Sequence, residues 1–390
     1  MYATVTDCAH KTAPRAESNA YGYSVGTRDI KGGRLLLENA KPVSQETFET
    51  WTQREVPTPD DLVLAREAPV GQVGMIKAGH RICLGQRTVL IRCSAELDSN
   101  YLLYRILGPE LQQWMEDHSE GSTVKHINVA DVRKMPLPDL PSLTEQRAIA
   151  SVLRAFDDLI DINTGLMSDL DAMYLTEWQR MFGRSVVEGE AFSLSELVST
   201  QYGYTASATD VGEDPKFLRV MDINKRNWID WGSVPHCPIS ARDLEKYRLR
   251  KGDIVVARMA DPGKSAIVDD DSQDAVFASY LVRLKPINGV FSHYIYGLLK
   301  SPFYSQYAEG ASGGSVQKNM NAKVITGVQV GTPSLVAVEA FDALGTEIRA
   351  GLNQLQAEVN ELSRTRDVLL PLLLSGKVAP NSAAKLLEAV

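Results

Sequence analysis

The chain has 390 residues, of which 44% are hydrophobic and 23% charged, and its net charge is −8. This length favours two to three domains, and this composition is typical of a globular protein in water. The longest apolar run near either end, residues 369–374, is too short to cross a bilayer, and no signal-peptide pattern opens the chain. Four cysteines without a C-x-x-C spacing favour free thiols in a reducing cytoplasm, and we expect no metal site.

The negative net charge conceals two long segments that are nearly neutral. Residues 1–140 carry 16 basic and 18 acidic side chains, and residues 185–333 carry 16 and 17. Domains that bind nucleic acid usually present a basic face. Each segment has enough cations to form such a face opposite an acidic one, so the charges permit DNA binding without demonstrating it.

Residues 1–140 combine short β-rich runs with one or two helical segments. The stretch 101–118 has apolar residues at helical spacing, with a Gly-Pro interruption in its middle. A Pro-rich break, "MPLPDLPSLTEQ", follows. These features predict a mixed α and β domain that ends at the break.

A long helix is predicted from Ser142 to about Phe182. Ser142 can serve as the N-cap with Glu145 three residues later, which is a capping box, and no proline follows before Phe182. Apolar residues recur there at steps of three and four. The residues that we expect in the buried seam of this helix are Val152, Phe156, Leu159, Leu166 and Leu170.

Residues 258–265, "RMADPGKS", end like the phosphate-binding motif G-x-x-x-x-G-K-[ST]. Arg258 stands where that motif requires its first glycine. The surrounding stretch 252–268 also aligns with 60–76, and in that alignment Gln72 and Val73 replace Lys264 and Ser265. Both stretches keep the two flanking apolar runs, but 60–76 lacks the lysine and serine that would bind phosphate. We therefore expect a turn between two strands.

The same alignment extends over both long segments at an offset of 191 to 193 residues. It places Asp29-Ile30 over Asp222-Ile223 and "LIRC" (90–93) over "LVRL" (281–284). Near the end of each segment it places Ser122, Lys125 and Asn128 over Ser315, Lys318 and Asn321. The chain therefore contains two copies of one module.

A second long helix is predicted from Ser334 to about Leu370. Apolar residues recur there every seven positions, which favours a coiled-coil partner: Phe341, Ile348, Leu355, Leu362 and Leu369. Two helices of about 40 residues would each span roughly 60 Å. We therefore predict a domain at 1–140, a helix at 141–184, a domain at 185–333 and a helix at 334–390, with approximate two-fold symmetry. Such a chain suits a target with two half-sites, for which DNA is the obvious candidate.

Residues 135–173 resemble the central conserved region of the specificity subunits of type I restriction–modification systems. In that family a P-L-P-x-L-x-E-Q-x-x-I-A run enters a long helix. The string "LLPLLLSGKV" (369–378) resembles the closing signature of the family, with Lys377 in place of an acidic residue. "QYGYTASA" (201–208) and "EGSTVKHI" (120–127) resemble the opening and the close of a target-recognition domain.

The resemblance implies an α+β fold with two α/β target-recognition domains, separated by two long helices that form an intramolecular antiparallel coiled coil. It implies a cytoplasmic, non-catalytic subunit that reads a bipartite, asymmetric site on double-stranded DNA and recruits two methyltransferase subunits, to which restriction subunits can be added. S-adenosylmethionine and ATP would bind those partners, and this chain would hold no cofactor. A modification-only or orphan specificity subunit remains open.

Cations and polar residues on predicted loops are the candidates for DNA contacts, because phosphates and base edges are bound by such side chains. Candidates with a counterpart in the other copy are Arg28, Lys31, Arg34, Lys225 and Arg226, then Arg66 with Arg258 and Lys125 with Lys318. Candidates without one are Lys11, His126, Tyr204, Lys216, Arg219, Lys264 and Asn319. Many of these charges can instead be solvated, and Arg66 and Arg258 can pair with an acid inside the fold.

Two other classes of function stay in view. A nucleotide-hydrolysing enzyme built on Lys264 would bind ATP, and Lys264→Ala would abolish that binding. A coiled-coil scaffold without a DNA role would depend on the 334–370 seam for its oligomeric state. The repeat and the family-like strings favour the DNA-recognition subunit over both.

Overall fold

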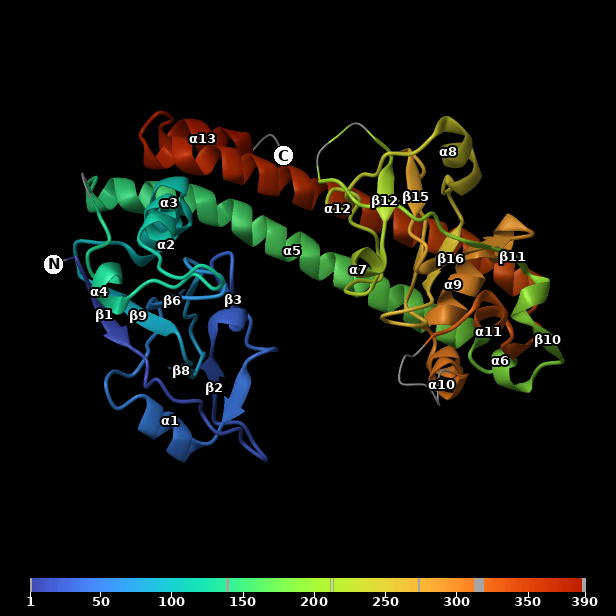
Figure 1. Ribbon diagram of the computed structural model, residues 1–390, viewed down its shortest axis with the longest axis horizontal. Coiled ribbons are helices and arrows are strands. Elements are labelled where there is room, and N and C mark those ends of the chain that lie inside the picture. The colour runs from blue at the N-terminus through green and yellow to red at the C-terminus, as the bar shows by residue number, and fades with distance from the viewer. Residues whose placement is uncertain are drawn as a thin grey trace. The chain divides into compact units, whose positions relative to one another are not determined.

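The computed structural model describes residues 2–137, 140–210, 212, 214–272, 274–311 and 319–387. The chain divides into two compact units, which we call unit 1 (residues 1–159 and 362–390) and unit 2 (residues 160–361). Helices α5 (Leu143–Phe182) and α12 (Leu335–Leu374) each pass from one unit into the other (Figure 1). Each unit is therefore built from one globular module and a part of both long helices.

The core of unit 1 is a four-stranded antiparallel sheet. Its strands in spatial order are β1 (Ala3–Asp7), β9 (Thr88–Cys93), β6 (Leu62–Ala65) and β7 (Val73–Met75). All four residues of β6 are buried, as is typical of an apolar run in a strand that is covered on both faces. A second sheet contains β5 (Lys41–Val43), β2 (Gly22–Val25) and β8 (Ile82–Leu84), with β2 and β8 parallel.

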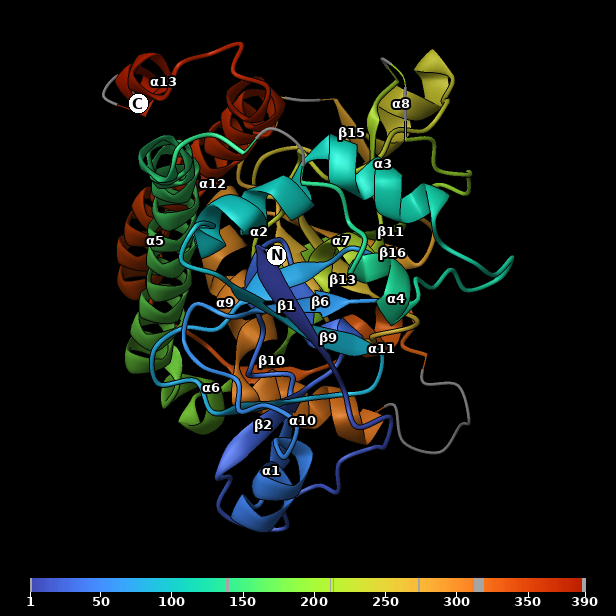
Figure 2. The same ribbon diagram turned by 90° about the vertical axis from the view of Figure 1, so that its left-hand side faces the viewer.

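Short elements complete unit 1. They are a 3-10 helix (Thr27–Asp29), β3 (Ile30–Lys31), β4 (Arg34–Leu35), α1 (Gln45–Trp51), α2 (Ser99–Leu107), α3 (Pro109–Asp117), α4 (Val129–Val132) and α13 (Pro380–Leu387). The helical segment expected over 101–118 is divided into α2 and α3 because Pro109, which has no N–H to donate, begins a new helix. Figures 1 and 2 both show α2 and α3 on one side of the main sheet, with α1 at the far end.

Unit 2 repeats this plan. Its main sheet has the order β11 (Val198–Tyr202), β16 (Leu281–Pro286), β13 (Ile254–Ala257) and β14 (Ser265–Ile267), again antiparallel throughout. A parallel pair, β12 (Lys216–Leu218) and β15 (Ala275–Phe277), corresponds to β2 and β8. Two further strands, β10 (Ala191–Ser193) and β17 (Gln329–Gly331), pair with each other.

The remaining elements of unit 2 are short helices. They are α6 (Ser185–Glu188), a 3-10 helix (Leu194–Glu196), α7 (Val220–Ile223), α8 (Ala241–Tyr247), a 3-10 helix (Gly289–Phe291), α9 (Ser292–Lys300), α10 (Pro302–Ala311) and α11 (Ala322–Thr326). The side chains of α9 pack against α5, where the indole Nε1 of Trp178 donates to the carbonyl of Tyr294 at 2.9 Å. Among the described residues, none of the helices combines the length and apolar character needed to span a membrane.

The internal repeat extends to the strand register and the turns. Leu62 pairs with Met75 in unit 1, and Ile254 pairs with Ile267 in unit 2, at the same offset of 192 residues. In the turn that follows, the amide of Gly71 donates to Ala65, and the amide of Gly263 donates to Ala257, both at 3.0 Å. The near-P-loop is thus a hairpin turn that leads into a strand, as predicted, whereas a phosphate-binding loop leads into a helix.

One part of the expected alignment was wrong. The letters "LIRC" and "LVRL" align at an offset of 191, but the sheet places Ile91 opposite Leu62 and Leu284 opposite Ile254, an offset of 193. The letters misled because Arg92 binds Asp61 (2.6 Å) and Arg283 binds Asp253 (3.3 Å) from positions two residues apart in the strand. Both units therefore keep an arginine–aspartate ion pair, but the arginine stands two residues earlier in the strand of unit 2 than in that of unit 1.

The long helices run antiparallel within each unit. In unit 2 the rings of Tyr174 and Phe341 lie 5.1 Å apart, and Asn163 donates to Glu358 at 3.1 Å. In unit 1 Arg366 binds Asp157 at 2.6 Å. Along these contacts the residue numbers on α12 increase as those on α5 decrease, which is the pattern of two antiparallel helices. The fold is the expected pair of mixed α and β domains joined by an antiparallel coiled coil.

The seam contains most of the expected residues, with one correction. Val152, Phe156, Phe341, Ile348, Leu362 and Leu369 are buried, and Leu159, Leu170 and Leu355 are partly buried. Leu166 is 46% exposed, and its neighbour Met167, at 1%, occupies the seam instead. The reason is periodicity: Met167 follows the buried Ile160 by seven residues, whereas Leu166 follows it by six and turns away by about 100°.

Candidate nucleic-acid interface

The parallel strands of each unit bring two loops to one edge. In unit 1 the carboxyl ends of β2 and β8 lie side by side, since the amide of Gly85 donates to the carbonyl of Val25 at 2.7 Å. The 3-10 helix at residues 27–29 follows β2, and the turn at residues 85–87 follows β8. Loops at the carboxyl ends of parallel strands commonly form ligand sites, because they converge on one side of the sheet.

A hollow of about 600 Å³ lies at this edge of unit 1. Its lining is polar and includes two arginines: Thr12, Ala13, Ser24, Gly26, Thr27, Arg28, Asp29, Asn39, Lys41, Gly85, Gln86 and Arg87. The predicted contact Arg28 belongs to this lining, and the predicted contact Lys11 directly precedes it in sequence. We call this hollow the unit 1 edge.

The backbone around the unit 1 edge is fixed by local hydrogen bonds. The carboxylate of Asp29 accepts from the amide of Gly26 at 2.8 Å, and burial raises the pKa of that carboxyl. Arg28, between them, is exposed to solvent. On the neighbouring turn, Arg87 lies 3.2 Å from Glu67 and Gln86 donates to the carbonyl of His10 at 3.3 Å. The two arginines thus extend from a rigid frame.

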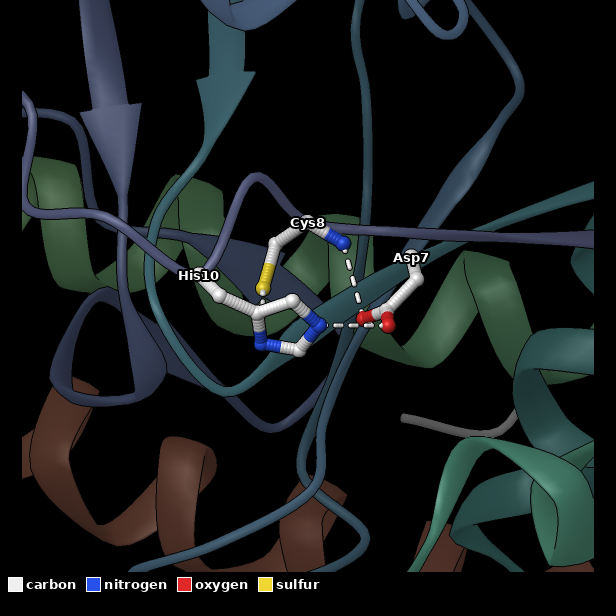
Figure 3. A group of neighbouring side chains, drawn as sticks. All are labelled: Asp7, Cys8 and His10. Atoms are coloured by element: carbon white, nitrogen blue, oxygen red, sulfur yellow. Dashed lines mark hydrogen bonds and ion pairs between the residues drawn. The ribbon is translucent and has the colours of Figure 1, made fainter.

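Asp7, Cys8 and His10 form the group of potential metal ligands found among the described residues, with donor atoms within 4.8 Å of one another (Figure 3). Asp7 binds Nε2 of His10 at 2.7 Å, whereas the sulfur of Cys8 lies 3.9 Å from Nδ1. The carboxylate of Asp7 and the thiol of Cys8 therefore contact different nitrogens of the His10 ring. The guanidinium of Arg66 lies 3.7 Å from the carboxylate of Asp7. This arrangement holds His10 and its carbonyl beneath Gln86 and opposes a bound dication.

Unit 2 has the same edge with different side chains. The amide of Ala278 donates to Leu218 as that of Gly85 does to Val25, and the amide of Arg219 donates to Asp222 at 2.8 Å as that of Gly26 does to Asp29. These matches place Met221 where unit 1 has Arg28. Tyr280 takes the place of Arg87, because their carbonyls accept from Arg258 and Arg66 at 2.9 and 2.8 Å. We call this the unit 2 edge.

A second group of cations surrounds a cavity of about 320 Å³ in unit 2. Its basic lining residues are Lys225, Arg226, Lys264 and Lys300, and the carboxylate of Asp171 lies among them. Burial lowers the pKa of Lys300 to about 7, and its ammonium donates to the carbonyl of Ser265 at 2.6 Å. In unit 1 the positions equivalent to Lys225 and Lys264 are Gly32 and Gln72, and the amide of Gly32 donates to the side-chain oxygen of Gln72 at 3.2 Å. Three predicted contacts are thus brought together here.

The predicted DNA contacts fall into two groups. Those exposed at the surface are Lys11, Arg28, Lys31, Lys125, Lys225, Arg226, Lys264 and Asn319, of which Lys125 binds Glu116 and Arg226 binds Asp230. Those at least half buried and engaged within the fold are Arg34, Arg66, His126, Tyr204, Lys216, Arg219 and Arg258. Lys318 lies outside the described residues.

Arg66 needs a correction, because it is buried. Its guanidinium donates to the carbonyl of Ile127 at 3.1 Å and lies near Asp7, which is the internal pairing that the sequence left open. The equivalent Arg258 lies over the ring of Tyr202, 5.0 Å from its centroid. Arg66 thus holds the end of β6 to its neighbours and is not available to a ligand, whereas Arg258 is partly buried and packs on an aromatic ring.

Three further candidates are also held inside the fold. Lys216 donates to the carbonyl of Val234 at 2.8 Å, and Arg219 binds Asp222 through two nitrogens. Tyr204 packs against Tyr247, with ring centroids 5.3 Å apart. Their contacts with other residues of the module hold the loops of the unit 2 edge in place.

Sequence reasoning missed several residues of these sites: Asn39, Lys41, Gln86, Arg87, Lys300, Met221 and Tyr280. Arg87 follows a Gly-Gln pair, which is a turn signal, and the repeat aligns it with Tyr280 once the offset of 193 is used. The search for paired cations overlooked it because its counterpart is aromatic. Lys300 lies within a buried helix and has no such signal.

Residues 10–171 match the protein family described as "Type I restriction modification DNA specificity domain". The MjaVIII specificity subunit of a type I restriction enzyme from Methanocaldococcus jannaschii is 22% identical over 331 residues, which cover 76% of each chain. The HindI specificity subunit from Haemophilus influenzae is 24% identical over 48% of this chain and 41% of its own. The fold is similar to that of a type I system S subunit from M. genitalium (TM-score 0.53, 15% identity, 95% and 96% of the two chains covered).

Proposed function

The chain belongs to the specificity subunits of type I restriction–modification systems, and from this premise we propose that its two units read the two halves of a bipartite site on double-stranded DNA. One observation carries the proposal. Both units present the same pair of loops at the carboxyl edge of a parallel strand pair, and the side chains on those loops differ. Equivalent frames with different contact residues suit two half-sites of different sequence.

The cation cluster of unit 2 fits a role in holding the DNA backbone. Lys225 and Lys264 are exposed, and like charges that share one cavity repel unless an anion joins them. A phosphate supplies that anion, and phosphate contacts fix the position of a protein on the duplex. We therefore assign Lys225 and Lys264 to the backbone and the two edges to the bases.

The second part of the proposal concerns partners. Ile162, Leu166 and Met173 are exposed large apolar residues on α5. Their spacing of four and seven residues places them along one side of the helix. We assign this stripe to contact with a methyltransferase subunit, which would carry S-adenosylmethionine. ATP would serve a restriction subunit, and this cytoplasmic chain would catalyse no reaction itself.

A comparison of N6-methyladenine across the host genome, with and without this gene, tests the proposal. We expect one bipartite motif, with two short specified halves around an unspecified gap, to lose its methylation. Replacement of residues 185–333 by the same region of another specificity subunit should then change one half only. Unchanged genome maps, together with no DNA binding by the complex purified with its methyltransferase, would refute the proposal.

ATP binding distinguishes the competing enzymatic function. A nucleotide-hydrolysing protein built on Lys264 would bind ATP without partners, and Lys264→Ala would abolish that binding. We expect no such binding, because the turn that carries Lys264 leads into β14. Its backbone amides at Gly263 and Lys264 already donate to Ala257 and Asp261.

A further inference from the structure

The two edges share three equivalent hydrogen bonds, which makes their side chains directly comparable. The amides of Gly26 and Arg219 donate to Asp29 and Asp222, both at 2.8 Å. One residue before each aspartate, unit 1 carries Arg28 and unit 2 carries Met221. Since the capping bonds fix this loop in both units, the two side chains start from equivalent positions.

The adjacent turn gives the second comparison. Arg66 and Arg258, themselves equivalent, donate through their backbone amides to Arg87 and Tyr280. The carboxyl ends of the parallel strands bring this turn next to the capped loop in each unit. The unit 1 edge therefore presents two guanidinium groups where the unit 2 edge presents a thioether and a phenol ring.

The chemistry of the unit 1 edge favours one base. A guanidinium donates two parallel hydrogen bonds to O6 and N7 of guanine in the major groove, and this pairing is the commonest specific contact between an arginine and a base. Arg28 and Arg87 are both accessible to solvent, and Arg87 needs only to exchange Glu67 for a base. Gln86 lies between the strand end and Arg87, so the edge is rich in donors.

The unit 2 edge has a different complement. Met221 is 54% exposed and Tyr280 is 55% exposed, although both are large and largely apolar. The apolar group that DNA offers in the major groove is the C5 methyl of thymine. Contact with that methyl removes apolar surface of both partners from water, which is favourable. The thioether of Met221 has no hydrogen to donate to a phosphate.

We propose that the unit 1 edge reads guanine through Arg28 and Arg87, and that the unit 2 edge reads the thymine methyl through Met221 and Tyr280. This inference rests on the proposed DNA-reading function and adds to it the base class of each half-site. The two halves of the site differ because one unit recognises hydrogen-bond acceptors and the other recognises an apolar group.

The experiment uses the chain in complex with its methyltransferase, on the DNA motif that the methylation map defines. Guanines in each half are replaced by 7-deazaguanine, which lacks the N7 acceptor, and thymines by uracil, which lacks the methyl. The proposal expects wild-type affinity to fall about ten- to a hundredfold with 7-deazaguanine in one half. It expects a smaller loss, about three- to tenfold, with uracil in the other half, since one methyl group is removed.

Variants of the chain assign each loss to its side chains. Arg28→Ala or Arg87→Ala should remove the sensitivity to 7-deazaguanine, and Met221→Ala or Tyr280→Ala should remove the sensitivity to uracil. Lys77→Ala is the matched control for unit 1, because Lys77 is an exposed cation that precedes β8 and thus lies at its opposite end. Ile287→Ala is the control for unit 2, because exposed Ile287 follows β16 whereas Tyr280 precedes it.

The outcomes separate the inference from the function on which it rests. If the wild-type complex binds no bipartite motif, the proposed function itself is wrong. If it binds one, but the base analogues have no effect or the four variants keep the wild-type sensitivities, only the inference is overturned. A weaker salt dependence in Arg28→Ala with unchanged base preference would also overturn it, because it would identify a phosphate contact.

Discussion

In unit 2 the guanidinium of Arg349 lies 2.7 Å from the carboxylate of Asp269, and Arg349 is only 1% exposed. The same group donates to the carbonyl of Asn227 at 3.0 Å and lies 3.7 Å from Asp171. Arg349 is on α12, Asp171 is on α5, and Asp269 follows β14. One buried cation therefore joins both long helices to the globular module of this unit.

Removal of that cation should be costly. Arg349→Ala leaves Asp269 buried without its partner, so we expect the free energy of unfolding to fall by about 3–5 kcal/mol. Urea-induced unfolding of the full chain measures the loss. The control is Arg242→Ala, an exposed arginine on α8, which should change the value by less than about 0.5 kcal/mol. Equal effects of the two variants would contradict this role for Arg349.

Buried His293 should make the stability of unit 2 depend on pH. Burial, with Arg349 nearby, lowers its pKa to about 4, below the ordinary value of 6.5. Between those values the unfolded chain binds the proton and the folded chain does not, so this contribution to stability is complete above pH 6.5 and declines as pH falls toward 4. The slope should approach roughly 1.4 kcal/mol per pH unit. Urea titrations of wild type and His293→Gln measure it, and a slope that persists in the variant would assign the effect elsewhere.

Two glycines in helices should respond oppositely to the same substitution. A Cβ at Gly297 in α9 would lie 2.1 Å from the indole of Trp178, whereas a Cβ at Gly165 in α5 would meet nothing within 4 Å. Gly297→Ala should therefore destabilise unit 2 by about 1–3 kcal/mol or more. Gly165→Ala should stabilise the chain by up to about 1 kcal/mol, since alanine favours a helix. Thermal unfolding of both variants checks the two signs.

The seam assignment can be tested by leucine truncation. Leu362→Ala removes a buried side chain and should cost about 2–5 kcal/mol, while Leu166→Ala should cost less than about 1 kcal/mol because Leu166 faces solvent. If the stripe on α5 docks a methyltransferase, Leu166→Ser should instead reduce co-purification of that subunit. A large loss of stability in Leu166→Ala would contradict this assignment, because it would show that Leu166 is buried in the seam.

The cation cluster of unit 2 should govern salt dependence. We expect Lys225→Ala with Lys264→Ala to weaken binding of all DNA sequences alike and to reduce the slope of log affinity against log salt by about two. Binding of the complex at several salt concentrations measures the slope. Lys246→Ala, an exposed lysine on α8, is the control and should leave the slope unchanged. An unchanged slope in the double variant would remove both lysines from the backbone contact.

Periodic and repeated features could be predicted from the sequence. Three features report a local preference and appear in the long helices: the N-cap Ser142, whose hydroxyl accepts from the amide of Glu145 at 3.3 Å, the proline-free stretch that follows, and the seven-residue spacing around Ile348. The repeat also predicted the turn at Gly263, because two copies that have diverged in sequence keep the same backbone there.

The site was harder to predict, because contacts between distant residues decide it. Arg66 looked like an available cation, but Asp7 and Ile127 reach it from opposite ends of the module and bury it. Met221 and Tyr280 carry no charge, so the search for cations did not find them; the hydrogen bonds of the two edges place them at the positions of Arg28 and Arg87. Charge alone identifies neither group, since burial and exposure are set by packing across the fold.

The nearly uniform offset of 192 to 193 residues between the two units has a consequence for how such a chain can arise. Matching registers and capping bonds some 190 residues apart are what a tandem gene duplication leaves behind. A dimer of identical half-length chains would carry the same residue at both edges and would be restricted to a palindrome. Fusion into one polypeptide lets position 28 remain arginine while position 221 becomes methionine, so each half can change its preference without altering the other.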